Sequence, residues 1–362
     1  MSGRTSFGKT RTLCLAFVLF GLLIASSCLP QPTSETGGIN ITLYGFSIMK
    51  EPLEKSIFPA FAAKWKQEHG QEVRFTPSYA GSETVTNQIL QGVKAQIAIL
   101  SIERDAQRLK EKGFVTSDWH ALPQKGIVNK TPFVILVRKG NPKGIHDFSD
   151  LAKPGVRLIH PDPISSGGAQ WSILAIYGSE LVKADKQQAA ESSGRVDSGD
   201  ARAIVQSRAL ELLRLIWRNV FSTPASAREA RTTFELGNGD ALVTYELDAL
   251  LMMKSNSNTD AEIVVPEATI FSEHPAVIVD RNVPASERPV VEAFMQYLWT
   301  EEAQRAFVQF HFRSTTNEAL NQENKELATI KWPFTVDYFG GWDKAYPEVI
   351  EHVFRDQVQK RK

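Results

Sequence analysis

Two serines and two glycines in a row, Ser165-Ser166-Gly167-Gly168, are the residues of this chain best suited to hold a small anion. They follow an apolar segment typical of a strand, Val156–Ile159, and a turn built on Pro161-Asp162-Pro163. After them, apolar residues from Trp171 to Leu181 are spaced as on one face of a helix. At a helix N-terminus, unpaired N–H groups and the helix dipole attract negative charge without any basic side chain. An ordinary serine cap after a loop is the alternative interpretation.

Other kinds of chemistry find less support in the residues. A serine hydrolase with Ser166 as nucleophile is a rival hypothesis, but the segment lacks the Gly-x-Ser-x-Gly pattern. His160 is close to Ser166 in sequence, and a histidine at the end of a strand is more often structural. The sequence has no His-x-x-x-His motif and no cysteine pair for a metal, and we expect neither a metal nor a cofactor. The sequence therefore favours a binding protein over an enzyme.

Length and charge restrict the class of protein further. With 362 residues and 42% hydrophobic residues, the chain is long enough for a large core divided between two lobes. Lys plus Arg and Asp plus Glu number 41 each, so the formal net charge is zero. This balance argues against nucleic acid as a partner, because such proteins usually have a basic excess or stripe. It leaves a small anion possible, since dipoles can hold one.

The N-terminal segment is typical of export. Three basic residues precede an apolar run from Leu13 to Ile24, which is too short for a membrane span. The small residues that follow end in Cys28 and resemble a bacterial lipoprotein signal, with a lipid attached to the thiol. We predict a signal peptide at 1–27 and a flexible tether at 28–38. Because Cys14 would be removed, the mature chain could form no internal disulfide. A plain secretory signal with a chance cysteine is the alternative.

From residue 39 onward, strand and helix patterns alternate, which predicts an α/β fold with largely parallel sheets. A polar insertion at 183–200 is expected to be a mobile surface loop. Pro59 is expected to kink a helix in its middle. Strands are expected at 41–45, 73–77, 97–100, 133–142, 156–159, 241–245, 263–265 and 276–280. Helices are expected at 52–69, at 82–93, around 204–216, at 288–299, at 301–311 and at the charged C-terminus.

Several segments resemble, in the same order, the periplasmic sulfate/thiosulfate-binding proteins of ABC transporters. Residues 133–142 resemble the family's apolar crossing strand, which ends in Arg-Lys-Gly-Asn-Pro. Residues 162–171 resemble its ligand-binding turn, and residues 239–246 resemble its Gly-Asp segment that ends in an aromatic residue and Glu. Residues 334–337 and 339–342 are also similar to the family. The resemblance covers nearly the whole mature chain.

This resemblance implies a periplasmic-binding-protein fold of type 2. In that fold, two α/β lobes are joined by crossing strands and close over the ligand like a hinge. The crossing strands would lie at 133–137 and near 264–277. The implied divisions are a discontinuous lobe 1 at 39–134 and 270–340, lobe 2 at 135–269, and a C-terminal helix at 341–362.

The resemblance also implies how an anion would be held. The family binds a dehydrated sulfate mostly through backbone N–H groups at helix N-termini, with one serine hydroxyl and one indole N–H. Ser166 would supply the hydroxyl, and Gly167 and Gly168 would supply amides, because glycine permits close backbone approach. The other matching positions are Ser47, Ile48, Ser82, Ala227 and Tyr245.

At three positions the residues differ from the family pattern. Tyr245 stands where the indole donor is expected, and its phenol can also donate a hydrogen bond. Ile48 lies in the first loop, where the sequence differs from that of the family, although the backbone N–H of Ile48 could still bind an anion. Gln170 replaces the arginine that is expected to support the binding turn.

The type of donor discriminates between anions. Phosphate carries a proton at neutral pH and needs an acceptor, whereas fully ionised sulfate needs donors only, and a buried carboxylate would repel it. All the matched residues are donors, which favours sulfate, thiosulfate or a molybdate-like anion over phosphate. Glu83, next to Ser82, is expected to be a solvated acid in a first helical turn.

We therefore expect an exported, lipid-anchored substrate-binding protein, in the periplasm or at the cell surface. It would act as a monomer and deliver sulfate or thiosulfate to the permease subunits of an ABC transporter in the membrane. Two alternatives stay open: a binding protein for molybdate, tungstate or phosphate, and a lipid-tethered anion sensor that signals to a partner protein. Both transport and sensing would use the same closed, loaded form.

Overall fold

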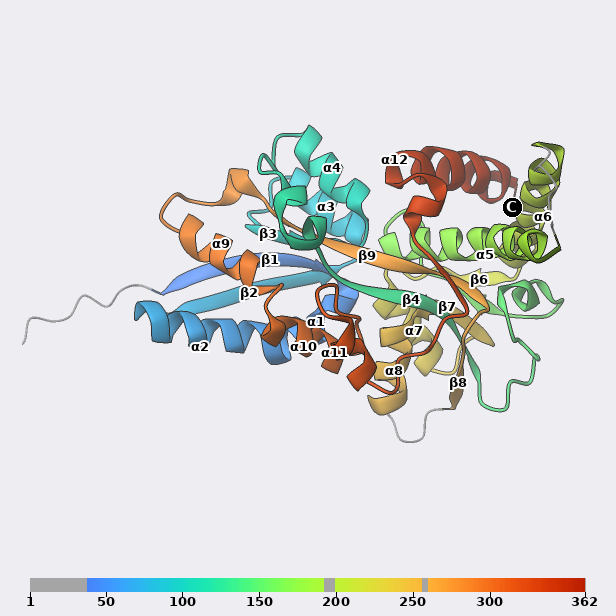
Figure 1. Ribbon diagram of the computed structural model, residues 1–362, viewed down its shortest axis with the longest axis horizontal. Helices are drawn as coiled ribbons and strands as arrows, with labels where there is room; N and C mark the ends of the chain where they lie inside the picture. The colour runs from blue at the N-terminus through green and yellow to red at the C-terminus, as the bar shows by residue number, and fades with distance from the viewer. Residues whose placement is uncertain (1–37, 192–198, 256–259, 362) are drawn as a thin grey trace, which may run out of the picture. The chain divides into compact units, whose positions relative to one another are not determined.

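The computed structural model describes residues 38–191, 199–255 and 260–361. The signal peptide predicted at 1–27 and the lipidation predicted at Cys28 lie outside the described residues, as does nearly all of the tether predicted at 28–38. Within the described part, ten strands form one sheet in the order β2-β1-β3-β9-β4-β7-β5-β6, with β10 beside β9 and β8 beside β4 (Figure 1). The strands are β1 (Ile39–Phe46), β2 (Val73–Ala80), β3 (Ile97–Ile99), β4 (Ile127–Arg138), β5 (Leu158–Ile159), β6 (Val220–Ser222), β7 (Ala241–Tyr245), β8 (Ala261–Val264), β9 (Ala268–Ile278) and β10 (Trp332–Phe334).

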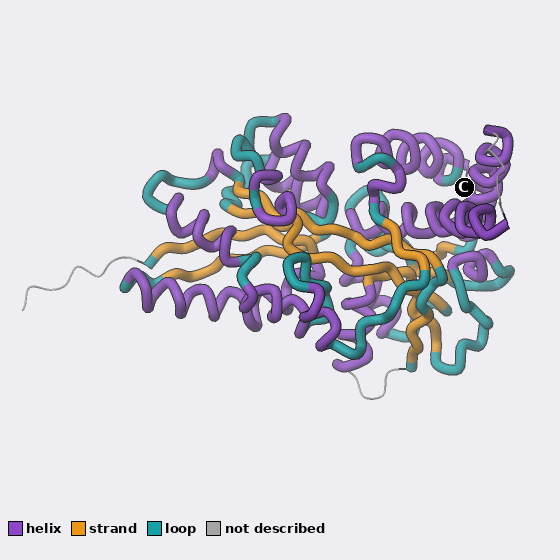
Figure 2. Tube along the Cα trace, in the orientation of Figure 1, coloured by secondary structure: helices purple, strands orange, loops and turns teal. Residues whose placement is uncertain are grey.

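Helices lie on both sides of the strands (Figure 2). The α-helices are α1 (Lys50–Pro52), α2 (Phe58–His69), α3 (Ser82–Leu90), α4 (Glu103–Glu111), α5 (Gly167–Glu191), α6 (Gly199–Arg218), α7 (Ala227–Glu235), α8 (Glu246–Ser255), α9 (Arg288–Tyr297), α10 (Glu301–Gln309), α11 (Glu318–Glu323) and α12 (Trp342–Lys344). The tighter and wider helical segments are η1 (Ser47–Met49), η2 (Leu53–Ile57), η3 (Trp119–Ala121), η4 (Pro123–Gly126), η5 (Phe148–Ala152), η6 (Asp280–Asn282), η7 (Val336–Phe339), η8 (Ala345–Asp356) and η9 (Gln359–Arg361).

Two long strands, β4 and β9, connect the two ends of the sheet. They pair antiparallel in the middle, where Asn129 lies opposite His274. Beyond that pairing, β9 continues alongside β3 and β4 continues alongside β7 and β8. We call the elements around β1, β2 and β3 the first lobe and those around β5, β6 and β7 the second lobe. The near-continuous apolar run of β4 follows from this position, because both faces of the strand are covered.

The sheet and one helical segment differ from the sequence expectations. The sheet is mixed: β4 and β9 run antiparallel to each other and to β3, β7 and β8, whereas the outer pairs and the short pair of β9 with β10 are parallel. The polar insertion at 183–200 is not a loop along its length, because α5 continues to Glu191 and α6 begins at Gly199. Its Lys, Gln, Glu and Ala residues are strong helix formers. Pro59 lies just after η2, a wider helical turn, within a helical run that continues from α1 through α2, so the helix departs from regular α geometry directly before the proline.

The C-terminal elements contact both lobes. Trp342 of α12 packs edge-to-face against Trp171 of α5, with ring centroids 4.7 Å apart. The guanidinium of Arg104 on α4 lies over the ring of Tyr346 in η8, 3.5 Å from its centroid. Gln107 of α4 also donates to Asp343 of α12. The chain end therefore packs on the second lobe and on the first.

A buried ion pair ties the second lobe to the segment after α10. Glu246, the first residue of α8, accepts hydrogen bonds from Arg313 at 2.8 and 3.0 Å and from the N–H of Ala328 at 2.6 Å. The backbone of Arg313 also forms a bridge to Lys130 in β4. Because Glu246 is buried, its charge depends on this one guanidinium.

Replacing Arg313 by methionine should lower the free energy of unfolding by about 3–5 kcal/mol, because it leaves a buried carboxylate without its partner. Urea denaturation of the purified mature chain measures this change. The matched control is Lys331→Met, which removes an exposed pair with Glu267 and should cost less than about 1 kcal/mol. Equal losses in the two variants would contradict the importance of the buried pair.

Candidate anion-binding site

The residues predicted for the site stand where helices begin after strands. Ser47 and Ile48 lie in η1 directly after β1, and Ser82 is the first residue of α3 directly after β2. Gly167 opens α5, and Ala227 opens α7. The carboxyl ends of strands in α/β sheets are the usual place for such sites. The predicted site residues other than the glycines all have buried side chains: Ser47, Ile48, Ser82, Ser166, Ala227 and Tyr245.

Glycines bring the helix starts of the two lobes into direct contact. A Cβ added to Gly167 would lie 3.2 Å from the Cβ of Ser82. A Cβ added to Gly168 would lie 2.8 Å from the hydroxyl oxygen of Tyr245. A Cβ added to Gly81 would lie 2.2 Å from the carbonyl oxygen of Ser165 and 2.9 Å from that of Ala225. The starts of α3 and α5 and the loop before α7 therefore meet at distances that only glycine permits.

Ser47 and Ile48 join this group through α7. The segment η1 contacts α7, whose first residue is Ala227. Next to it, Arg228 donates to both carboxylate oxygens of Glu51 on α1, at 2.6 and 2.5 Å. Burial alone would raise the pKa of Glu51, but the hydrogen bonds and charge of Arg228 lower it overall. This pair is a second direct link between the lobes.

The start of α5 retains donors for a ligand. The N–H groups of Gly167 and Gly168 have no intrahelical acceptor, because they open the helix. The Ser166 hydroxyl oxygen accepts only a long hydrogen bond, 3.4 Å from the N–H of Ala169, and its own hydrogen stays available. The carbonyl oxygen of Asp162 fixes the turn by accepting from the N–H of Ser166 at 2.9 Å. In an ordinary serine cap, the hydroxyl oxygen would accept a hydrogen bond of normal length from a backbone N–H in the first turn of the helix.

The Ser82 hydroxyl is committed within its own lobe. It donates to Asp105 at 2.6 Å and accepts from the N–H of Ser101 at 2.9 Å. Its backbone N–H, at the start of α3, has no intrahelical acceptor. Ser82 can therefore offer a ligand its amide and, in this arrangement, not its hydroxyl.

Ser101 is a site residue that sequence reasoning missed. Its hydroxyl lies 2.8 Å from the hydroxyl of Tyr245, and either oxygen can be the donor. Its carbonyl oxygen accepts from the indole N–H of Trp171 at 2.6 Å. Burial raises the pKa of Tyr245 well above its usual range, so the phenol keeps its proton. Ser101 follows the apolar strand β3, and this position at a strand end was the signal that could have identified it.

Glu83 is not the solvated acid that the sequence predicted. It is buried, and its carboxylate pairs with Arg108 and, at 3.3 Å, with Arg104. It also accepts from the side-chain amide of Gln170 at 3.1 Å. Gln170 belongs to α5 and additionally donates to the carbonyl of Pro163 at 3.3 Å. Where an arginine was expected, a neutral amide thus links the binding turn to the first lobe.

His160 has a structural role in this arrangement. Its Nδ1 donates to the carbonyl of Pro161 at 2.7 Å, and its Nε2 accepts from the hydroxyl of Ser172 at 2.5 Å. Burial lowers the pKa of His160 to about 4. With both ring nitrogens engaged, the imidazole has no nitrogen left to activate Ser166. Within the part of the chain that the structure describes, no group of three or more His, Cys, Asp or Glu side chains is placed to hold a metal ion.

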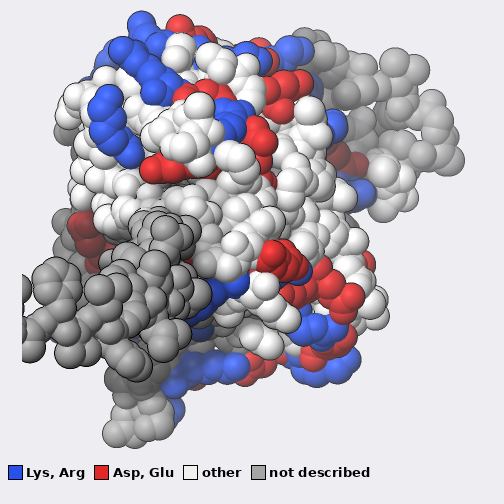
Figure 3. Space-filling model, turned by 90° about the vertical axis from the view of Figure 1, so that its left-hand side faces the viewer, with Lys and Arg blue, Asp and Glu red and all other residues white. Residues whose placement is uncertain are grey.

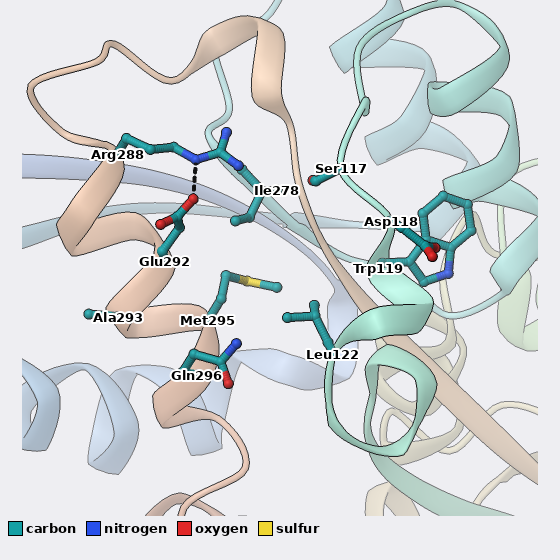
Figure 4. A pocket seen from close by; sticks show the side chains of 10 residues that line it. All are labelled: Ser117, Asp118, Trp119, Leu122, Ile278, Arg288, Glu292, Ala293, Met295 and Gln296. Atoms are coloured by element: carbon teal, nitrogen blue, oxygen red, sulfur yellow. Dashed lines mark hydrogen bonds and ion pairs between the residues drawn. The ribbon is translucent and has the colours of Figure 1, made fainter.

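A separate cavity of about 330 Å³ lies between α9 and η3 (Figure 4). None of the predicted site residues lines it. Its guanidinium, Arg288, pairs with Glu292 at 2.6 Å and also with Asp280, so its charge is compensated. On the face shown in Figure 3, basic and acidic side chains are interspersed. This cavity and this surface therefore offer an anion fewer free hydrogen-bond donors than the helix starts do.

A family model for bacterial extracellular solute-binding proteins matches residues 42–313. The chain belongs to this family. Over 365 residues it is 32% identical to the sulfate-binding protein of Synechococcus elongatus, covering 99% of this chain and 97% of that protein. It is 34% identical over 308 residues to the sulfate-binding protein of Escherichia coli, covering 83% and 88% of the two chains. The resemblance to sulfate- and thiosulfate-binding proteins is thereby confirmed.

Solved structures confirm the fold of this solute-binding protein. The sulfate-binding protein SubI from Mycobacterium tuberculosis matches with a TM-score of 0.73 and 28% identity, covering 86% of this chain and 99% of that chain. A periplasmic thiamin binding protein, 13% identical, shares the two-lobed fold with a TM-score of 0.55. No helix among the described residues combines the length and apolar composition that crossing a bilayer requires.

Replacing Gly81 by alanine tests the close contact between the lobes. The backbone of Gly81 has φ −60° and ψ 145°, which alanine adopts without strain, so the fold should be retained. The added methyl group would meet backbone oxygens of the facing lobe, and the affinity for an anion held at these helix starts should fall about 10- to 100-fold. Calorimetry measures the affinity, and thermal unfolding without the anion checks that the variant is folded. Unchanged affinity in a folded variant would show that the two lobes do not need this contact.

Proposed function

We propose that this chain is the exported solute-binding protein of an ABC transporter and captures sulfate or thiosulfate between its two lobes. One observation carries the proposal: the starts of α3 and α5 meet with Ser166, Gly167 and Gly168 between the lobes. Relatives named sulfate-binding and thiosulfate-binding proteins, which match over most of the chain, support it. The captured anion is handed to the permease subunits in the membrane, and the protein acts as a monomer without catalysing a reaction.

The site binds a dianion through dipoles. The amides of Ile48, Ser82, Gly167, Gly168 and Ala227 supply donors, and the hydroxyls of Ser166 and Tyr245 add two more. Amides at helix starts carry partial positive charge and are held in place by the helices, so they do not reorganise when the anion arrives. The buried position excludes water and strengthens each hydrogen bond.

Closure of the two lobes completes the site. We assign lobe 1 to 39–134 and 270–340 and lobe 2 to 135–269, with 341–362 as a C-terminal helix, and β4 and β9 cross between the lobes. The contact of Ser101 with Tyr245 and the pair of Glu51 with Arg228 join lobe 1 to lobe 2. Such contacts stabilise the closed form, and the anion adds its own bonds to both lobes.

Calorimetry of the mature chain against sulfate, thiosulfate, molybdate and phosphate tests the choice of anion. Sulfate or thiosulfate should bind most tightly, because the proposed ligands are donors and a protonated phosphate would lack an acceptor. Phosphate binding without any response to sulfate or thiosulfate would contradict the proposal. Tight binding of molybdate alone would assign the site to a different oxyanion.

Replacing Ser166 by alanine should weaken sulfate binding by about 1–3 kcal/mol, because the hydroxyl meets a buried anion. The matched control is Ser179→Ala on α5, the helix that Ser166 directly precedes. Ser179 is buried, and its hydroxyl has no hydrogen-bond partner among the described residues, so its loss should leave sulfate affinity unchanged. Equal effects in the two variants would place the anion elsewhere.

We also propose that Cys28 is lipidated after cleavage of residues 1–27 and anchors the protein to a membrane surface. In cells supplied with a labelled fatty acid, the chain should incorporate the label and sediment with membranes. Cys28→Ser should lose the label and become soluble, while Cys14→Ser should behave like the unchanged chain. Labelling that survives Cys28→Ser would contradict this anchor.

A further inference from the structure

A carboxyl group lies directly behind the proposed anion site. Asp105 on α4 is fully buried, and its Oδ2 accepts from the hydroxyl of Ser82 at 2.6 Å. Ser82 opens α3, and its Cβ lies 3.2 Å from where a Cβ on Gly167 would be. The Ser82 side chain therefore links this carboxyl to the place where the starts of α3 and α5 meet. An ionised carboxylate at this position would repel an incoming dianion.

The positive charge near Asp105 is shared with another acid. Arg108 lies 3.3 Å from Asp105 through Nη1, and the same nitrogen pairs with Glu83. Arg108 also donates to Asn87 at 2.7 Å. Arg104 pairs with Glu83 and lies over an aromatic ring of η8. Two buried carboxyl groups thus share two guanidinium groups, and nothing in this cluster compensates the further charge of a bound anion.

Burial raises the pKa of Asp105 well above its usual range, and the charge of Glu83 raises it further. The hydrogen bond from Ser82 and the charges of Arg108 and Arg104 lower it by less. Other charged or titratable side chains on elements that contact α4 include Asp343 and Lys344 on α12, Tyr346 on η8, His120 on η3, whose ring lies 2.5 Å from Glu103, and Glu273 and His274 on β9. Burial lowers the pKa of His274 to about 3, so it stays neutral near pH 7.

We propose that anion binding is coupled to protonation of Asp105, so that the protein takes up a proton from solvent together with its anion. This inference rests on the proposed function. The proton is transferred to Oδ2 of Asp105, and no other bond is made or broken. The neutral acid then donates to the Ser82 oxygen, which still accepts from the N–H of Ser101. The Ser82 hydrogen, which the carboxylate had accepted, is released and becomes an additional donor for the anion.

Two physical effects therefore act in the same direction. Protonation removes a negative charge from behind the site, and it converts the Ser82 hydroxyl from a committed donor to an available one. By linkage, the anion in turn raises the pKa of Asp105 further. Affinity is highest where Asp105 is protonated in the free protein and declines as the pH rises through its titration. Sulfate remains a dianion throughout this range, so the ligand does not contribute the effect.

Calorimetry with sulfate between about pH 5.5 and about pH 8.5, in two buffers of different ionisation enthalpy, tests this coupling. The unchanged chain should take up a fraction of a proton per sulfate bound near neutral pH. Its affinity should fall about tenfold from the low to the high end of the range. Asp105→Asn should bind without proton uptake, with a pH-independent affinity close to that of the unchanged chain at low pH.

Two further variants keep the test decisive if Asp105→Asn does not fold. Glu83→Gln removes the charge that raises the pKa of Asp105, so the fall in affinity should occur at lower pH. Glu273→Gln is the matched control, since burial also raises the pKa of that carboxyl but the site does not contain it. It should keep the pH dependence and proton uptake of the unchanged chain.

The outcomes separate this inference from the proposed function. Sulfate binding with no proton uptake and a constant affinity would overturn the inference and leave the function standing. A pH dependence that disappears in Glu273→Gln would assign the proton to another carboxyl and would also overturn it. The absence of heat with sulfate, thiosulfate, molybdate and phosphate alike would instead overturn the proposed function.

Discussion

The arrangement depends on the close approach of helix starts, which brings backbone amides to one buried point. Amides can act as ligands only if no side chain keeps the helices apart, and Gly81, Gly167 and Gly168 provide that freedom. A Cβ at Gly81 would press on carbonyl oxygens of the facing lobe, which are backbone atoms and cannot rotate away. The geometry of the site is therefore determined by three residues that contribute no side chain. The strands before each helix place these residues at one edge of the sheet.

Buried ions set a second constraint, because each one must be paired where the two lobes meet. Arg228 pairs with Glu51 across the lobes, and the fully buried Asp248 pairs with Arg231 at 2.8 Å. Breaking such a pair leaves an uncompensated charge, which costs far more than the intact pair contributes. The proposed anion has no cationic side chain as a partner, so amide dipoles have to take the place of the water that it loses. The charged side chains nearby must therefore be balanced among themselves.

Local patterns in the sequence were sufficient for the parts of the site that follow one another along the chain. The turn before α5 and its glycines are contiguous, and their types indicate a helix start that is either an ordinary serine cap or an anion site. The strand of Tyr245 is a separate segment that the family resemblance added. The environment of Glu83 could not be predicted in this way, because it depends on which helix lies beside α3, whereas Ser101 stands at a strand end that the sequence does indicate. Similarly, the residues of β4 and β9 predict strands but not their antiparallel pairing, which is a tertiary contact. The helical part of the insertion up to Glu191 was missed because polarity was weighed above the helix propensity of its residues.

Two of the departures from the family pattern, at Tyr245 and Gln170, have the same physical consequence. An indole donor is replaced by the Tyr245 phenol supported by the Ser101 hydroxyl, and an arginine is replaced by Gln170, whose amide bonds to Glu83. Both replacements keep a hydrogen bond at the interface between the lobes. The second also removes a full positive charge, so Glu83 draws instead on Arg104 and Arg108. In its fully buried position Asp105 pairs directly only with Arg108, which it shares with Glu83, and a proton on this carboxyl would remove the negative charge behind the proposed anion site.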